Sequence, residues 1–280
     1  MALRRATILL LGVLALAACG GADESPPGAE PPATTQAPAP ATTAEQEPRQ
    51  LLVYFLRDEK LGVAPRTVAA TEGVGAAALR ELLAGPGELE RDAGFQTAVP
   101  AETELLGLSI ADGVATVDLS GAFAAGGGSL SMQSRVAQVV YTLTQFPTVE
   151  RVAFRLDGEP VESIGGEGVL VDPPVARAAF ESVTPIILVE EPTFGEDAAS
   201  PLRITGTANT FEATFVAEVK APDGSLIAQQ IVTATSGSGD RGTFEASIPF
   251  AGTAASLVVF APNADDGGRL HEVEIRLGQP

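Results

Sequence analysis

The sequence predicts an α+β domain followed by an all-β sandwich, both placed behind a disordered N-terminal tether. Three observations lead to this class. Residues 20–48 are rich in Pro, Ala, Thr and Glu and contain no aromatic residue, Leu, Ile or Val, so they cannot bury enough apolar surface to fold. Residues 50–160 mix strand-like runs with helical periodicity. Residues 185–280 contain strand-like runs alone, separated by turn residues about every eight to twelve positions.

The N-terminus has the pattern of a secretory signal. Arg4 and Arg5 precede an apolar run over residues 6–18, which is shorter than the roughly 20 residues that a membrane span needs. The last residues of this run and the only cysteine form Leu-Ala-Ala-Cys at 16–19, which resembles the lipobox of bacterial lipoproteins. The resemblance implies that the Cys19 thiol carries a diacylglycerol anchor and that residues 1–18 are removed. The alternatives are a secreted protein with an incidental Cys, or a Cys that packs as a small hydrophobe.

The charge of the chain argues against two classes of partner. The chain has 17 basic and 36 acidic residues, a net charge of −19, and removal of residues 1–18 takes away two Arg, which leaves 15 − 36 = −21. Such a surface repels nucleic acid and anionic lipid headgroups. The lipid on Cys19 is therefore the predicted contact with the membrane. With this one thiol acylated, the folded part is held without disulfides, by a chain that is 45% hydrophobic.

The α+β domain is predicted over 50–160 with the element order β-α-β-β-α-β and helices that cover a small sheet. Ser129 or Ser131 can cap the second helix, whose apolar periodicity continues until Pro147. Gly85 and Pro86 end the first helix. In chain order the expected elements are a buried strand at 51–56, a helix at 75–84, a hairpin at 104–120 that turns at Asp112-Gly113, the second helix, and a strand at 149–158.

The second domain is predicted over 185–280, after a linker at 161–184. We expect hairpin turns at 222–224 and 265–268, where the sequence reads PDG and DDGG. Seven strands are expected, with the sequences IILVEE, LRITGTA, ATFVAEVKA, SLIAQQIVTA, GTFEASIPF, ASLVVFAP and HEVEIRL.

Several separated motifs resemble known families. The motifs VPAETELLGLSIADGVATVDLS, VVYTLTQFPTVERVAFRLDG and GVLVDPPVARAAFE, with the Gly-Ser entry to the second helix, together resemble the GerMN domain of sporulation and germination lipoproteins over residues 50–180. The stretches SPLRITGTANTFEATF and GTFEASIPF resemble the immunoglobulin-like, Gmad2-like domain that often follows it. The resemblance implies a lipoprotein that works through protein contacts in ring-building or sensor-kinase-associated assemblies, although a single GerMN domain puts ring formation in doubt.

A search for catalytic constellations finds no supported active site. His271 is the only histidine, and without CxxC or HExxH it has no metal partners; it is expected at a surface or an edge. The Gly-rich stretch 124–131 can cradle an anion at a helix start, but a flexible entry loop explains it more simply. Asp112 and the Asp265-Asp266 pair lack the spacing of a calcium loop. No cofactor and no metal are therefore expected.

The sequence favours a non-enzymatic lipoprotein at the outer face of the cytoplasmic membrane, which acts as a scaffold or interaction module with an envelope protein partner. A sensor that binds a cell-wall fragment or another small ligand is the alternative, and a cell-wall hydrolase a minor one. A deep interdomain pocket with convergent polar groups would favour the sensor, whereas a solid core with a flat apolar patch would favour protein contacts. The sequence assigns no oligomeric state.

Overall fold

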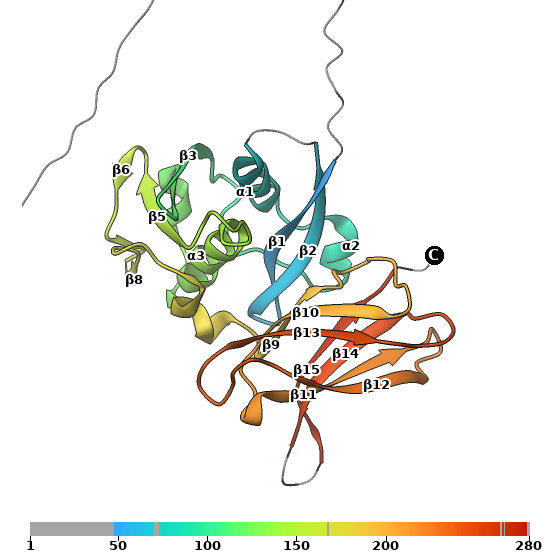
Figure 1. Ribbon diagram of the computed structural model, residues 1–280. Coiled ribbons are helices and arrows are strands. Elements are labelled where there is room, and N and C mark those ends of the chain that lie inside the picture. The colour runs from blue at the N-terminus through green and yellow to red at the C-terminus, as the bar shows by residue number, and fades with distance from the viewer. Residues whose placement is uncertain (1–47, 70–72, 167, 264, 266, 279–280) are drawn as a thin grey trace, which may run out of the picture. The chain divides into compact units, whose positions relative to one another are not determined.

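A computed structural model of the protein describes residues 48–280 except 70–72, 167, 264, 266, 279 and 280 (Figure 1). Within these residues a mixed α/β domain precedes an all-β domain, as the sequence predicts. The predicted signal peptide, Cys19 and the predicted tether up to residue 47 lie outside the described residues.

The first domain begins with a β-hairpin. β1 (Arg49–Arg57) pairs antiparallel with β2 (Lys60–Val68) along its whole length. The sequence predicts only the apolar run at 51–56, because Pro65 and its polar neighbours interrupt the apolar pattern of β2. Proline is compatible with β2 because β1 is its only strand partner among the described residues.

Two helices follow the hairpin. α1 (Val74–Ala84) agrees with the predicted helix and ends at Gly85, whose φ of 79° is favourable only for glycine and whose N–H donates to the Leu82 carbonyl. α2 (Glu88–Asp92) is an additional short acidic helix.

A mixed four-stranded sheet forms the other side of this domain, with the strand order β3-β4-β5-β6. The predicted hairpin is confirmed, since β3 pairs antiparallel with β4 across the Asp112-Gly113 turn. β4 and β5 pair in parallel, and the 3₁₀ turn η1 and the long helix α3 form the crossover that a parallel pair requires. The bounds are β3 Leu105–Ala111, β4 Val114–Leu119, η1 Gly121–Ala124, α3 Ser129–Leu143, β5 Arg151–Leu156 and β6 Glu159–Pro160.

The start and end of α3 differ from the sequence prediction. Its N-cap is Gly128, without a side-chain cap hydrogen bond, so the prediction that Ser129 or Ser131 caps the helix is wrong. The hydroxyl of Ser131 instead accepts a hydrogen bond from Arg135 at 3.2 Å. The helix ends at Leu143, the N–H and hydroxyl of Thr144 both donate to the Val140 carbonyl, and Pro147 follows outside the helix.

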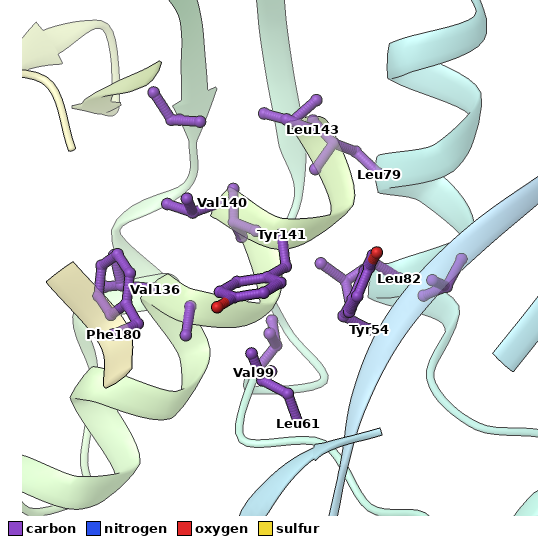
Figure 2. Packing of buried hydrophobic residues seen from close by; sticks show 14 of the residues in the cluster. Tyr54, Leu61, Leu79, Leu82, Val99, Val136, Val140, Tyr141, Leu143 and Phe180 are labelled. Carbon is purple, nitrogen blue, oxygen red and sulfur yellow. The ribbon is translucent and has the colours of Figure 1, made fainter. Parts of the chain in front are cut away.

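α3 is the centre of the first hydrophobic core. The side chain of Tyr141 on α3 lies near that of Tyr54 on β1, with ring centroids 5.3 Å apart, and Leu79 and Leu82 of α1 lie alongside (Figure 2). Three short elements after β6 also contribute, and their Ile164 and Phe180 are fully or almost fully buried in this core. These elements are β7 (Ser163–Ile164), β8 (Val169–Leu170) and η2 (Arg177–Val183).

The second domain is a sandwich in which all seven predicted strands are present. One sheet has the order β13-β10-β9 and the other β12-β11-β14-β15. Phe215 and Phe244 meet edge to face in its core, 4.8 Å apart. The 222–224 turn joins β11 to β12 as predicted, and residue 266 of the 265–268 turn lies outside the described residues. The bounds are β9 Ile187–Glu191, β10 Leu202–Ala208, η3 Phe211–Ala213, β11 Thr214–Lys220, β12 Leu226–Thr233, β13 Gly242–Ile248, β14 Ser256–Pro262 and β15 Arg269–Arg276.

None of the described helices has both the length and the apolar character that a membrane crossing requires.

Candidate functional site

A cleft of about 580 Å³ lies where the β1-β2 hairpin meets two strands of the sandwich. Its walls come from three segments that are distant in sequence: the hairpin end at 57–63, the stretch 184–194 with β9, and residues 271–275 of β15. β9 and β15 are edge strands of their sheets, so the cleft opens onto the edges of the sandwich. This volume is within the range of about 300–1,000 Å³ that is typical of ligand sites.

The floor of the cleft is apolar. Phe95 and Phe194 meet edge to face with ring centroids 5.5 Å apart, and both line the cleft together with Leu61 and Ile187. Gly62 permits this arrangement, because a Cβ at that position would lie 3.0 Å from the Phe95 ring. The apolar floor offers an incoming molecule a surface from which water is readily displaced.

The rim of the cleft is charged, with an acidic excess. Asp58 lies in the two-residue turn of the hairpin, where it and Glu59 have φ of 52° and 62°. Glu272 and Glu274 project from the exposed strand β15. The two basic side chains of the rim, Arg57 and Lys60, each donate to a backbone carbonyl across the cleft.

Two hydrogen bonds join the hairpin to the other walls. Arg57 Nη1 donates to the Glu274 carbonyl at 2.6 Å, and Lys60 Nζ donates to the Ser182 carbonyl at 2.6 Å. The cleft therefore has two basic side chains held by hydrogen bonds at its mouth and an apolar floor beneath them.

A partly buried polar network lies beside the cleft and joins β9 to the first domain. Arg177 Nη1 contacts Glu190 Oε1 at 2.7 Å, and the Arg177 guanidinium lies 4.6 Å from the Tyr141 ring centroid. The Tyr54 hydroxyl donates to the same Glu190 carboxylate. Burial raises the pKa of Tyr54 well above its usual value, and the negative charge of Glu190 adds to this while Arg177 opposes it. Tyr54 is thus a neutral donor in this network.

A second ion pair joins η2 to the sandwich. Arg241 donates to both carboxylate oxygens of Glu181 at 2.8 Å, and its Nη2 also donates to the Pro185 carbonyl at 2.8 Å. Asn209 Nδ2 donates to Glu181 at 2.9 Å. The hydrogen bond from Arg241 holds the pKa of Glu181 below its usual range, against the opposing effect of burial.

This lowered pKa predicts an acid-sensitive domain junction. A carboxylate whose pKa is lower in the folded state stabilises the fold above its unfolded pKa and loses that contribution as the pH falls through the folded value. We therefore expect the thermal midpoint of the protein to fall between about pH 5 and pH 3. Glu181→Gln should have a lower midpoint at pH 7 and a shallower decline on acidification. Equal slopes for the two proteins would contradict a role for Glu181.

Of the residues singled out in the sequence, those that the structure describes are not brought together in one site, and Cys19 and Asp266 lie outside the described residues. His271 is exposed on the edge strand β15 and lines the cleft, with φ of 56°, which confirms its expected surface or edge position. Asp112 lies in the β3-β4 turn. In the Gly-rich stretch 124–131, the carbonyls of Ala125 and Gly126 accept hydrogen bonds from Arg135 of α3 at 3.0 and 3.2 Å. Among the described residues, no three His, Cys, Asp or Glu side chains form a group that could hold a metal ion.

The cleft and its polar network were not found from the sequence. The network combines Arg177 of η2, Glu190 of β9 and Tyr54 of β1, three elements that are distant in sequence. Within its own segment, none of these residues forms a motif that indicates a site. The available signal is a charged residue next to a strongly apolar run, as at Glu190 after Ile-Ile-Leu-Val, because such a position needs a partner when the strand is buried.

The fold and its elements define a protein in which a mixed α/β domain is joined to an immunoglobulin-like sandwich. Residues 52–162 match the family model Germane, described as "Sporulation and spore germination". Residues 186–268 match the model Gmad2, described as "Immunoglobulin-like domain of bacterial spore germination". The chain therefore carries a GerMN-type domain followed by a Gmad2 domain, and the resemblance inferred from its motifs is confirmed.

Several solved structures match parts of the chain. A crystal structure described as "Putative Lipoprotein from Clostridium perfringens" is 22% identical over 49% of this chain and 93% of its own, with a TM-score of 0.36. The tandem GerMN domains of the sporulation protein GerM from Bacillus subtilis are 17% identical over 72% of this chain and 62% of their own, with a TM-score of 0.42. The first of these GerM domains alone is 22% identical over 46% of this chain and 98% of its own, with a TM-score of 0.38. No curated protein matches the sequence.

Proposed function

We propose that this protein is a non-catalytic interaction module of the bacterial cell envelope, which binds a protein partner through the cleft between its GerMN-type and Gmad2 domains. The cleft is the observation that carries the proposal, because it combines an apolar floor, open strand edges and a charged rim. Protein recognition sites commonly have an apolar centre within a polar rim. The family matches support an envelope role of the germination type.

The proposal includes a lipid anchor. In it, residues 1–18 are a signal peptide, Cys19 carries a diacylglycerol, and residues 19–49 are a tether that holds the GerMN-type domain (50–160), the linker (161–184) and the sandwich (185–280) at the outer face of the cytoplasmic membrane. The Leu-Ala-Ala-Cys sequence at 16–19 supports this. A lipid-anchored module of this kind meets partners that are themselves membrane-bound.

Cys19→Ser is expected to release the protein from membranes, because the apolar run before it is too short to anchor a mature chain. Fractionation of cells that make the variant measures this as a shift from the membrane pellet to the soluble fraction. The control is Ser25→Ala, six residues further on in the proposed tether, which should stay in the pellet. A processed Cys19→Ser protein that remains in the pellet would show that something other than lipid holds it.

The partner is tested by crosslinking in the native envelope. A photoreactive residue at position 58 or 274, on the rim of the cleft, should give a discrete crosslinked species with another envelope protein, whereas the same residue at position 112, in the exposed β3-β4 turn and not part of the cleft lining, should not. Crosslinking of equal yield from all three positions would contradict a partner site at the cleft.

A second function, binding of a small ligand by a sensor module, is favoured by the same cleft. An interdomain pocket with convergent polar groups is the feature expected for it, and the cleft has such groups in Arg57, Lys60 and His271. The two functions differ in what binds. Cell-wall fragments that bind the full chain stoichiometrically and block the crosslinks from positions 58 and 274 would establish the sensor instead of the protein-contact function.

A further inference from the structure

The open edge of strand β15 borders the cleft. Among the described strands β15 pairs only with β14, so its other side has no strand neighbour. The C-terminal end of this side is closed, because Gly195 N–H donates to the Arg276 carbonyl at 2.9 Å and Asp197 forms a parallel bridge with Gly278. Residues 271–275 line the cleft, but the register with β14 shifts between Leu270 and Val273 and His271 has φ of 56°, so the regular part of the open edge is 273–275.

The backbone polar groups of Glu274 face this open side. Its carbonyl accepts the hydrogen bond from Arg57, which comes from the hairpin wall and not from β14. In an antiparallel pair, alternate residues direct both N–H and C=O to the same side of the strand. The N–H of Glu274 therefore also points into the cleft. The Arg57 side chain donates the hydrogen bond that a neighbouring strand would otherwise donate to the Glu274 carbonyl.

The side chains around this edge suit an extended segment. Phe95 and Phe194 form the floor, and Val273 and Ile275 of β15 lie half-buried beside it. A strand added to an edge directs alternate side chains to one face, so every second residue of an incoming segment would meet this apolar floor. Three residues of such a segment, opposite 273–275, span roughly 10 Å.

The charges at the rim indicate a cationic occupant. Among the charged residues that line the cleft, Asp58, Glu181, Glu272 and Glu274 are acidic and Arg57 and Lys60 are basic, which gives 2 − 4 = −2. No ion pair in the described part of the chain includes Asp58 or Glu274. The net charge of the whole chain, −19, attracts cationic segments over a longer range.

We propose that the partner inserts an extended segment, in which apolar residues alternate with Lys or Arg, into the cleft as an added β-strand along residues 273–275 of β15. This inference rests on the proposed interaction function and specifies the chemistry of its partner. Backbone pairing with Glu274 supplies the register, the phenylalanine floor selects apolar side chains, and the carboxylates of Asp58 and Glu274 select basic ones. The Arg57 side chain protects the edge when no partner is bound, as charged residues commonly do on exposed edge strands.

The test uses a fluorescent heptapeptide of alternating Val and Lys, titrated with the full chain and followed by anisotropy. The unmodified peptide should bind. The same peptide with alternate backbone nitrogens methylated should bind at least about tenfold more weakly, because it loses the hydrogen bonds of one edge. The corresponding Val and Glu peptide should not bind. Equal binding of the methylated peptide would overturn strand addition, and equal binding of the acidic peptide would overturn the charge selection.

Variants of the protein test whether the peptide binds along β15. Glu274→Pro removes the N–H that faces the cleft and leaves the pairing with β14, so it should weaken binding about tenfold with an unchanged thermal midpoint. Glu274→Gln keeps the N–H and should weaken binding less while lowering its salt dependence. Arg57→Ala should tighten binding, because it frees the Glu274 carbonyl and removes a like charge. If no heptapeptide binds while the crosslinks from positions 58 and 274 persist in the envelope, this inference fails and the proposed function stands. If the heptapeptides do not bind and the crosslinks are also absent, both this inference and the proposed function fail.

Discussion

Phe154→Ala is expected to destabilise the GerMN-type domain by about 3–5 kcal/mol, the range for truncation of a buried Phe. Phe154 lies on β5, is 3% exposed, and stacks on Phe123 with ring centroids 6.1 Å apart. Because β5 pairs in parallel with β4 at the centre of the sheet, the cavity left by the ring cannot close by a local movement. Chemical denaturation of the full chain measures the loss.

Arg155→Ala is the matched control on the same strand. Its side chain is exposed on the opposite face and donates only to the nearby Gly158 carbonyl, so its removal should cost less than about 1 kcal/mol. Comparable losses for the two variants would show that the assigned faces of β5 are wrong. Because the two residues are adjacent and share the same backbone pairing, a difference in stability between the variants reports on the two side chains.

The sandwich was predictable because each of its strands carries its own signal. In β13, Phe244 is buried and its neighbours Thr243 and Glu245 are exposed, the period-2 pattern of a half-buried strand. The Asp112-Gly113 hairpin was equally predictable, because the turn requires positive φ at both residues and Asp-Gly is a preferred pair for such turns. Such local features depend on only a few consecutive residues.

β2 was not predictable, because its residues depend on partners that are distant in sequence. Arg66 interrupts the apolar pattern, yet in the structure its side chain is 17% exposed and pairs with Glu90 at 2.5 Å. The hydrogen bonds from Arg66 and from the Gly87 N–H lower the pKa of Glu90, although burial alone would raise it. The sequence pattern suggests that Arg66 faces solvent, but it is half-buried, and only the packing of α2 on the hairpin reveals this.

The candidate site was not predictable for the same reason. Its walls at 57–63, 184–194 and 271–275 belong to different sheets, and each segment alone is an ordinary strand or turn. The exposed edge position of His271 was inferred correctly, because a polar residue near the start of a terminal strand needs no partner. That this edge faces a phenylalanine floor follows only from the way the two domains pack.

Arg177→Leu is expected to destabilise the protein by about 3 kcal/mol, and to do so at the domain junction. Removal of the guanidinium leaves the Glu190 carboxylate, 21% exposed as a side chain, with the Tyr54 hydroxyl and without its counter-charge. It also removes the contact with the Tyr141 ring and the hydrogen bond to the Thr144 hydroxyl at 2.8 Å. The thermal midpoint measures the loss, and hydrogen exchange of β9 locates it.

Arg203→Leu is the control, because Arg203 pairs with Glu191, the residue next to Glu190, while its side chain is 57% exposed. Solvent screens such an exposed pair, so the thermal midpoint of this variant should be close to that of the wild type. The double variant Arg177→Leu, Glu190→Leu should recover part of the stability lost in Arg177→Leu, since much of the cost of breaking a buried pair is the charge left behind. A double variant less stable than Arg177→Leu would mean that Glu190 is held mainly by Tyr54, and that the arginine is secondary to the junction.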